Sequence, residues 1–422
     1  MNSTGEKTLW SLSSLQAGKT NYQSKETRYI KLKRLDDLEQ LLKVRRGPEN
    51  GQPLFVRLIK QMLALDANQR ITPSEVLKHP FFNTGLSRSA PCTDMNSTGG
   101  ENLVSFLGEG GFGVVTRCRN TKNNQIVAIK VNKSDPEILQ QAKQEIFILE
   151  QLQRLDPDRC NIVEWNGYFL DGERICLNFE LLDQSLWDYI GGWNNQGLPI
   201  RELRPILHQI ANALFHLGSV GIVHADLKPA NIMVVNRHES PIKVKLIDFG
   251  LACNTSAVIT GDRVGTVGYC APEVMLGIPY DEAIDMWALG LVAVELATGV
   301  PLYPGEDDYD VLKFIIETQG QLPDHLLESG LYTDCYFIED NYYEQHWTFK
   351  TEEQFQYETN YQSKETRYIK LKRLDDLEQL LKVRRGPENE TGPPGIMGKT
   401  IKPNKRRCDS DVHRLVGIYV SI

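Results

Sequence analysis

The sequence has few of the features of a secreted, zinc-binding or membrane-spanning protein. Its eight cysteines are scattered, with no Cys-x-x-Cys pair and no histidine cluster near them, which argues against a disulfide framework or a zinc site. The opening residues, MNSTGEKTLW, lack the basic-then-apolar pattern of a secretory signal. The most apolar stretch, Trp287 to Val300, contains Glu295 and is too short to cross a bilayer. We therefore expect a soluble intracellular protein, nuclear or cytoplasmic with the nucleus favoured, and no membrane partner.

The chain also lacks an excess of positive charge. Its 47 Lys and Arg residues stand against 55 Asp and Glu residues, which gives a formal net charge of −8. A protein that binds nucleic acid over its whole surface shows the opposite balance, so we expect no direct nucleic-acid partner. The composition, 41% hydrophobic and 24% charged, is that of a globular chain. The length of 422 residues suits one large two-lobed unit with appendages.

One segment of the chain occurs twice. Residues 20–50 recur letter for letter as residues 359–389, and the MNSTG of residues 1–5 recurs at 95–99. Two copies so far apart do not form a solenoid, in which neighbouring repeats stack. Identity without drift indicates a recent duplication or an artefact of gene assembly.

The repeat and the local composition divide the chain into five regions. In chain order we expect an N-terminal extension (1–19), a duplicated segment with its continuation (20–83), a linker (84–100), a large folded region (101–389) and a flexible basic tail (390–422). The linker is rich in Ser, Thr, Asn and Gly. The basic run 399–407 in the tail suits a nuclear-import patch or a solvated tail equally well.

The continuation after the first copy has the pattern of folded sequence. Its apolar residues Leu58, Ile59, Met62 and Leu63 have helical spacing. The run Thr72-Pro73-Ser74-Glu75 predicts the start of another short helix.

A glycine-rich turn opens the large folded region. Leu107 to Val115 reads LGEGGFGVV, in which three glycines have G-x-G-x-x-G-x-V spacing. Such glycines let backbone amides approach phosphate oxygens. A Rossmann turn would continue into a helix, whereas here a strand, Ile126 to Val131, follows with the sequence IVAIKV.

Two charged residues after this turn suggest a phosphate-binding pair. Lys130 ends the strand, and Glu145 lies on a helix that Asp135 and Pro136 are expected to start. Each alone would be an ordinary solvated side chain. As a pair they would fix the ammonium group to meet the α and β phosphates of a nucleotide.

Four further motifs follow in order. They are His-Ala-Asp-Leu-Lys-Pro-Ala-Asn at 224–231, Asp-Phe-Gly at 248–250, Ala-Pro-Glu at 271–273 and Asp-Met-Trp at 285–287. With the glycine turn and Val-Ala-Ile-Lys, this series resembles the eukaryotic protein kinases over about residues 101–389, and agreement by chance is negligible. The shorter stretches HADLKPxNIM, EAIDMW, PLYPG and ETQGQLP are similar to the homeodomain-interacting protein kinases, relatives of the dual-specificity tyrosine-regulated group.

The resemblance implies an α+β, bilobal protein kinase-like fold, with a β-rich N-lobe from about 101 to 179 and a helical C-lobe. It implies that the chain transfers the γ-phosphate of Mg-ATP to Ser/Thr hydroxyls of protein substrates, with ATP and Mg²⁺ as cofactors. Transcription regulators are the partners that it suggests. A pseudokinase scaffold with an incomplete C-lobe and a dual-specificity kinase remain as alternatives.

The same resemblance assigns roles to residues of this sequence. Asp226 would orient the acceptor hydroxyl and take its proton, and Lys228, typical of serine/threonine kinases, would neutralise the γ-phosphate. Asn231 and Asp248 would be the Mg²⁺ ligands, Phe179 the gatekeeper, and Glu180 to Leu182 the hinge that reads adenine. The residues expected at the ATP site are Leu107, Gly108, Glu109, Gly110, Gly111, Phe112, Gly113, Val115, Ala128, Lys130, Glu145, Phe179, Glu180 and Leu182.

Three positions of the catalytic and activation loops depart from the family pattern. Ala225 replaces the Arg that usually precedes the catalytic Asp, as it does in the homeodomain-interacting group. Arg263 stands where that group has an activation-loop tyrosine, and Cys270 stands where it has an Arg before Ala-Pro-Glu. We therefore expect neither tyrosine autophosphorylation of the loop nor a firm preference for proline after the target residue, and Thr266 is the residue next to the acceptor site.

The end of the C-lobe is the largest departure. The family's Leu-x-x-Asp-Pro-x-x-Arg segment, whose Arg pairs with the Glu of Ala-Pro-Glu, is absent after residue 389 and occurs instead at Leu65 to Thr72. Either the gene is a chimera, or the N-terminal segment docks on its own C-lobe and pairs Arg70 with Glu273. The 19 residue steps between Phe82 and Glu101 reach roughly 60 Å at full stretch, which permits docking.

Overall fold

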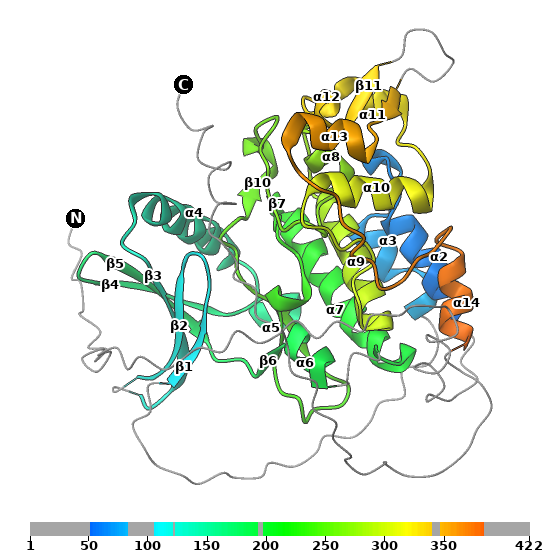
Figure 1. The fold of residues 1–422 in the computed structure, drawn as a ribbon. Helices are drawn as coiled ribbons and strands as arrows, with labels where there is room; N and C mark the ends of the chain where they lie inside the picture. Colours follow the sequence, from blue (N-terminus) through cyan, green and yellow to red (C-terminus); the bar gives the residue numbers. More distant parts are fainter. Residues whose placement is uncertain (1–50, 83–104, 121–122, 193–196, 340–346, 384–422) are drawn as a thin grey trace, which may run out of the picture. The chain divides into compact units, whose positions relative to one another are not determined.

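The computed structural model describes residues 51–82, 105–120, 123–192, 197–339 and 347–383 (Figure 1). The expected N-terminal extension, the first copy of the repeat, the linker and the basic tail lie outside the described residues.

The N-lobe is a five-stranded antiparallel sheet with the order β1-β2-β3-β5-β4. Its strands are β1 (Ser105–Glu109), β2 (Gly113–Arg119), β3 (Ile126–Asn132), β4 (Trp165–Asp171) and β5 (Arg174–Glu180). Along β3, the alternate residues Val127, Ile129 and Val131 are buried, which is the period of a strand with one covered face. The expected strand therefore forms, one residue longer than predicted.

Helix α4 (Pro136–Leu152) packs on this sheet. Its N-cap is Asp135, whose carboxylate accepts hydrogen bonds from the amides of Glu137 and Ile138, as the sequence pattern predicted. Buried Ile146 and Leu149 fix the helix against the lobe and turn Glu145 inward.

The C-lobe is built around two long helices, α7 (Ile200–Ser219) and α9 (Ala283–Thr298). Fifteen of the sixteen residues of α9 are buried, which explains why its sequence is apolar all round. The helix expected from Leu203 to Gly221 begins three residues earlier and ends at Ser219, with Val220 as its C-cap.

Shorter elements complete the C-lobe. The helices and 3₁₀ turns are α5 (Pro157–Cys160), α6 (Leu186–Gly192), η3 (Pro229–Asn231), η4 (Thr255–Ala257), α8 (Pro272–Met275), α10 (Asp308–Gln319), α11 (Asp324–Ser329), α12 (Thr333–Tyr336), α13 (Glu352–Thr359) and α14 (Asp376–Val383). The strands form three small sheets, namely β6 (Gln184–Ser185) with β8 (Ile232–Val234) and β9 (Val244–Leu246), β7 (Ile222–Val223) with β10 (Cys253–Asn254), and β11 (Phe337–Glu339) with β12 (Trp347–Phe349).

The segment that precedes the N-lobe in sequence belongs to the C-lobe in space. It forms α2 (Gln52–Met62), η1 (Ala67–Gln69), α3 (Pro73–Leu77) and η2 (Pro80–Phe82). In Figure 1 these blue elements lie among the C-lobe helices, where α2 packs on α9 and α3 on α7. The predicted short helix starts with a capping box, in which the Thr72 hydroxyl accepts from the Glu75 amide and the Glu75 side chain accepts from the Thr72 amide.

The apolar residues of this segment are part of the main hydrophobic core. Phe55, Leu58, Ile59, Met62 and Leu63 are fully buried, and each such side chain contributes about 1.5–3 kcal/mol relative to an exposed one. A Cβ on Gly290 of α9 would lie only 2.8 Å from Leu63, so a glycine is needed where the segment crosses α9. Docking of the segment is therefore close packing and not a loose contact.

The described part of the second repeat copy runs along the C-lobe and ends in α14. Buried Leu371, Leu374, Leu377 and Leu381 point its apolar side into the core. Helix α14 lies against α2, so the orange and blue ends of the described chain are neighbours in Figure 1. No helix among the described residues is long and apolar enough to span a membrane.

Candidate active site

The glycine-rich turn joins β1 to β2 as a hairpin. Glu109 pairs with Val114, and the Gly110 amide donates to the Gly113 carbonyl at 2.9 Å. A Cβ on Gly113 would meet the Val131 carbonyl oxygen at 2.2 Å, so this glycine is required by the neighbouring strand. Around Gly108, Gly110 and Gly111, in contrast, no described atom lies within 4 Å of a built Cβ. The hairpin thus leaves open space of the kind that phosphates need beside backbone amides.

Lys130 lies between two carboxylates. Its Nζ is 2.8 and 2.9 Å from the two oxygens of Glu145 and 2.9 Å from Oδ1 of Asp248. Burial works to lower the pKa of Lys130, but the carboxylates of Glu145 and Asp248 outweigh burial and raise it. Burial likewise acts to raise the pKa of Asp248, and the Lys130 ammonium overcomes that effect and lowers it. The site therefore holds a permanent cation next to an ionised carboxylate.

Asp248 itself is positioned by a strained backbone. Its φ is 61°, a left-handed conformation that is uncommon outside glycine. A Cβ on Gly250 would lie 3.3 Å from Asp248 Oδ1 and 3.7 Å from the Lys130 ammonium, so Gly250 leaves room for this cluster. Gln141 of α4 donates to the Gly250 carbonyl at 2.9 Å and ties the helix to the turn.

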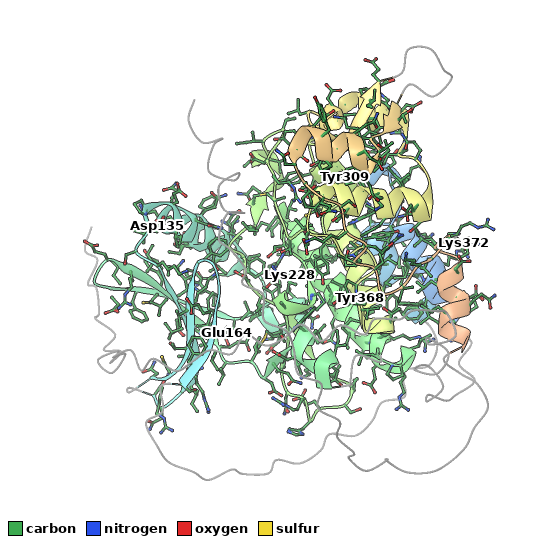
Figure 2. All side chains as sticks on the ribbon, viewed as in Figure 1. Asp135, Glu164, Lys228, Tyr309, Tyr368 and Lys372 are labelled. Atoms are coloured by element: carbon green, nitrogen blue, oxygen red, sulfur yellow. The ribbon has the colours of Figure 1, made fainter. Side chains whose placement is uncertain are left out.

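A second cluster surrounds Asp226 on the loop after β7. Lys228 Nζ is 2.7 Å from Asp226 Oδ2, and Asn231 donates from Nδ2 to the same oxygen at 3.0 Å. The Thr266 hydroxyl donates to Asp226 Oδ1 at 2.6 Å and accepts from Lys228 at 2.7 Å. Figure 2 labels Lys228, which lies between the N-lobe sheet and the C-lobe helices. An alcohol donor, a cation and a carboxylate thus meet at one point.

The loop that carries Asp226 is held by a residue that the sequence interpretation did not assign. The buried carboxylate of Asp285, at the start of α9, accepts from the amides of His224 and Ala225 at 2.7 and 2.9 Å. Burial raises the pKa of Asp285, and these hydrogen bonds oppose that shift. Ala225 has a φ of 65°, which the two bonds help to enforce. The available signal was an acidic residue opening an otherwise apolar helix, since a buried carboxylate needs partners.

Side chains of the C-lobe anchor the segment between Asp248 and Ala271. Tyr269 donates its hydroxyl to Glu295 of α9 at 2.6 Å. Arg263 donates from Nε to Asp308 at 2.7 Å and from Nη1 to the Cys270 sulfur at 2.9 Å. The two positions that depart from the family pattern, Arg263 and Cys270, therefore contact each other. Neither Asp308 as the partner of Arg263 nor Glu295 as the partner of Tyr269 could be identified from the sequence.

Arg70 and Glu273, which are 203 residues apart, lie together in the C-lobe. The Arg70 guanidinium makes a two-pronged contact, from Nη1 to Oε1 at 2.6 Å and from Nη2 to Oε2 at 3.1 Å. Arg70 also donates to the carbonyls of Ala64 and Ala283. Both charged side chains are buried, at 0% and 4% exposure, so neither has water as an alternative partner.

The residues expected around the adenine lie on neighbouring strands of the N-lobe sheet and just after β5. Ala128 stands opposite Phe179 in the β3–β5 register, and Val115 stands opposite Lys130 in the β2–β3 register. The Glu180 carboxylate accepts from Lys245 at 2.7 Å and from the Glu164 amide at 2.6 Å, so its side chain has a structural role. Leu182 is buried directly after the last strand.

The donor set suits a nucleotide with a hard cation. Asn231 and Asp248 offer amide and carboxylate oxygens, and the Ile247 amide donates to the Asn231 carbonyl, which holds the two residues side by side. Among the described residues, no group of three or more His, Cys, Asp or Glu side chains forms a self-sufficient metal site. A cation here would need phosphate oxygens as further ligands, as Mg²⁺ commonly does.

Comparison with known proteins agrees with this geometry. The protein kinase domain model matches residues 102–347, and the chain therefore belongs to the protein kinase family. It is 41% identical over 279 residues to homeodomain-interacting protein kinase 1 of Mus musculus, covering 66% of this chain and 23% of the relative. It is 38% identical over 287 residues to homeodomain-interacting protein kinase 1 of Caenorhabditis elegans (66% and 34%) and 36% identical over 280 residues to homeodomain-interacting protein kinase 4 of Mus musculus (65% and 46%).

The chain thus spans between about a quarter and a half of the length of these relatives. The matched region contains both clusters, Lys130–Glu145–Asp248 and Asp226–Lys228–Thr266, but not the N-terminal segment that carries Arg70.

Proposed function

We propose that the chain is an ATP-dependent protein serine/threonine kinase. The observation that carries this proposal is the hydrogen bond from the Thr266 hydroxyl to Asp226, next to Lys228. A carboxylate that already accepts from an alcohol, with an ammonium group beside it, is arranged to orient an acceptor Ser or Thr hydroxyl and to take its proton.

The remaining residues bind and orient the nucleotide. The hairpin of Leu107 to Val115 would cover the phosphates, and Lys130, held by Glu145, would contact their oxygens. Asn231 and Asp248 would hold Mg²⁺, which when bound neutralises phosphate charge. Lys228 would stabilise the charge on the transferred group, because an ammonium there is fixed before the reaction begins.

The substrates that we propose are proteins that present Ser or Thr, and transcription regulators are the first class to test. This rests on the similarity to proteins named homeodomain-interacting kinases. A nuclear location would suit such partners. The overall charge of −8 argues against a nucleic-acid partner, and we propose no membrane partner.

The test is phosphate transfer from Mg-ATP to a generic protein acceptor by the full chain beside Asp226→Asn. We expect transfer by the first and a loss of about 10²–10⁴-fold in the second, with Ser and Thr as the modified residues. No detectable phosphate transfer by either protein, when both are folded, would favour a pseudokinase scaffold. Modified tyrosine in the acceptor would favour a dual-specificity kinase.

A further inference from the structure

One surface of the C-lobe holds the second repeat copy through many specific contacts. The carboxylate of Asp310 on α10 is fully buried and accepts from the hydroxyls of Tyr361 and Ser363 at 2.5 and 2.7 Å. The Arg367 guanidinium lies 4.2 Å from the ring centre of Phe314. We call this surface, formed by α10 and α2, the repeat groove. With the second copy in place, the buried acid is satisfied by two hydroxyl donors of that copy.

The far end of the repeat groove is made by the N-terminal segment. Lys60 Nζ lies 2.7 Å from Asp375, and the Gln52 side chain donates to the Leu381 carbonyl at 2.6 Å. The last turn of α14 therefore ends beside the first turn of α2. Figure 2 labels Lys372, which lies at this end of the C-lobe.

The first repeat copy carries every side chain that makes these contacts. Residues 20–50 are identical to 359–389, so the first copy supplies the same two hydroxyls, the same arginine and the same leucines. The matching residues are Tyr22, Ser24, Arg28, Leu32, Leu35, Asp36, Leu38 and Leu42. One groove thus has two chemically identical ligands in the same chain.

Chain connection also permits the first copy to enter. In the first copy, residue 44 is the equivalent of Val383, where α14 ends. The described N-terminal segment starts at Gly51, seven residue steps after residue 44. Seven residue steps reach roughly 23 Å when extended. The end of α14 already contacts Gln52, so a first copy bound in the position of α14 would need only a short connection to Gly51. The second copy is tethered from the other side, since α13 ends at Thr359, two residues before Tyr361.

We propose that the repeat groove is a binding site for either copy, and that residues 20–44 of the same chain replace residues 359–383 in it. The two arrangements make the same contacts and differ only in the tether. Intramolecular ligands on short tethers compete at high effective concentration, on the order of millimolar. The C-lobe would therefore exist in two forms that exchange, one with residues 20–44 bound and one with residues 359–383 bound.

Cross-linking tests the exchange in the full chain. The Lys60→Cys/Asp375→Cys and Lys60→Cys/Asp36→Cys variants are treated with a short bis-maleimide, and the linked peptides are identified by mass spectrometry. We expect both pairs to cross-link within one chain. A Lys60→Cys/Ser14→Cys variant, with its second thiol outside the repeat, measures cross-linking by tether alone and should be at least about tenfold slower.

Competition between the two copies gives the decisive measurement, because disabling one copy should increase binding of the other. Adding Leu377→Asp, which disables the second copy, should raise the yield of the 60–36 cross-link, and adding Leu38→Asp should raise that of the 60–375 cross-link. The proposal would be overturned if the cross-link between positions 60 and 36 formed no faster than the Ser14 control. It would also be overturned if Leu377→Asp did not raise the yield of that cross-link. A 60–36 cross-link found only between two chains would also overturn it and would indicate exchange between molecules.

Thermal unfolding supplies a second measurement that does not depend on thiols. With exchange, Leu377→Asp and Leu38→Asp should each lower Tm little, and the double variant should lower it by far more than their sum. If Leu377→Asp alone lowers Tm as much as the double variant does, only the second copy fits and the proposal fails.

Discussion

Among the described residues, Lys130 carries the positive charge that lies between two carboxylates at the candidate site. Its ammonium contacts Glu145 from α4 and Asp248 from the loop after β9. Elements from both lobes therefore meet at a single side chain. The raised pKa of Lys130 favours its charged form, whereas burial raises the pKa of Glu145.

We predict that the substitution Lys130→Met causes a large loss of phosphate-transfer activity. The variant removes the fixed cation that would meet the phosphates and leaves the buried Glu145 carboxylate without its partner. We expect kcat/KM for ATP to fall by about 10²-fold or more. Lys133→Met, a change at an exposed lysine just beyond the same strand, is the control and should stay near the unsubstituted value.

Steady-state kinetics at several ATP concentrations makes this measurement. A folded Lys130→Met protein with unchanged kcat/KM would mean that the phosphates bind elsewhere.

The sequence could predict these single residues only where a motif places them. Lys130, Glu145, Asp226 and Asp248 each belong to a spaced series, and the structure puts them into two clusters. Asp285 also stands in a motif, but the loop that it holds could not be predicted. Asp308 and Glu295 stand in no motif, and each acts through a partner far along the chain. A single sequence shows an acidic residue but not what it will contact.

Among the elements, α9 carries a buried acid with an unusual titration. Burial raises the pKa of Glu295 from 4.5 to about 7, and the hydrogen bond from Tyr269 only partly opposes this shift. A carboxyl whose pKa is higher in the folded state binds more protons there. It therefore stabilises the fold less as pH rises from about 4.5 to 7.

We predict that Glu295→Gln removes this pH dependence. The amide keeps an oxygen acceptor for Tyr269 but cannot ionise. The unfolding free energy of the variant, relative to the unsubstituted protein, should increase by up to about 3 kcal/mol between pH 5 and pH 8. Urea unfolding at a series of pH values measures it, and a difference that does not change with pH would contradict the assignment.

The docked elements η1 and α3 depend on Arg70. Its guanidinium is the sole described partner of the Glu273 carboxylate, from which solvent is excluded. Arg70→Ala leaves that charge buried, so we predict a loss of about 3–5 kcal/mol in unfolding free energy. Arg57→Ala, at an exposed position on α2, is the matched control and should change stability by less than about 0.5 kcal/mol.

Chemical denaturation followed by tryptophan fluorescence suits this pair, because the Arg70 guanidinium lies 5.4 Å from the ring centre of Trp287. Equal stability of the two variants would show that the segment does not hold the C-lobe together in solution.

Element boundaries were predicted to within a few residues where the pattern is strong. The strand from Ile126, the helix after Asp135 and the capping box at Thr72 all form as the local sequence indicates. The path of residues 360–383 along α10 and α2 could not be predicted. Hydrophobic spacing identifies an apolar face but not the distant element that covers it.

At the level of the whole molecule, the C-lobe is assembled from pieces that are distant in the sequence. Helices α2 and α3 precede the N-lobe in the chain, yet they pack on α7 and α9, which follow it. Asp226 and Asp248 lie on loops carried by that same helical core, because Asp285 of α9 holds the loop of Asp226. We therefore expect catalysis to depend on the docked N-terminal segment.

The most direct test is to cut the chain between that segment and the N-lobe. Residues 87–94 are replaced by a protease recognition sequence, and phosphate transfer from Mg-ATP is measured before and after cleavage. The N-terminal fragment is then removed in mild denaturant, and the remaining polypeptide is refolded and measured. Transfer is measured once more after the fragment is added back. We predict that the cleaved pieces stay together and stay active. Activity should disappear without the fragment and return when the fragment is added. Full activity of the remaining polypeptide on its own would show that catalysis does not need the N-terminal segment.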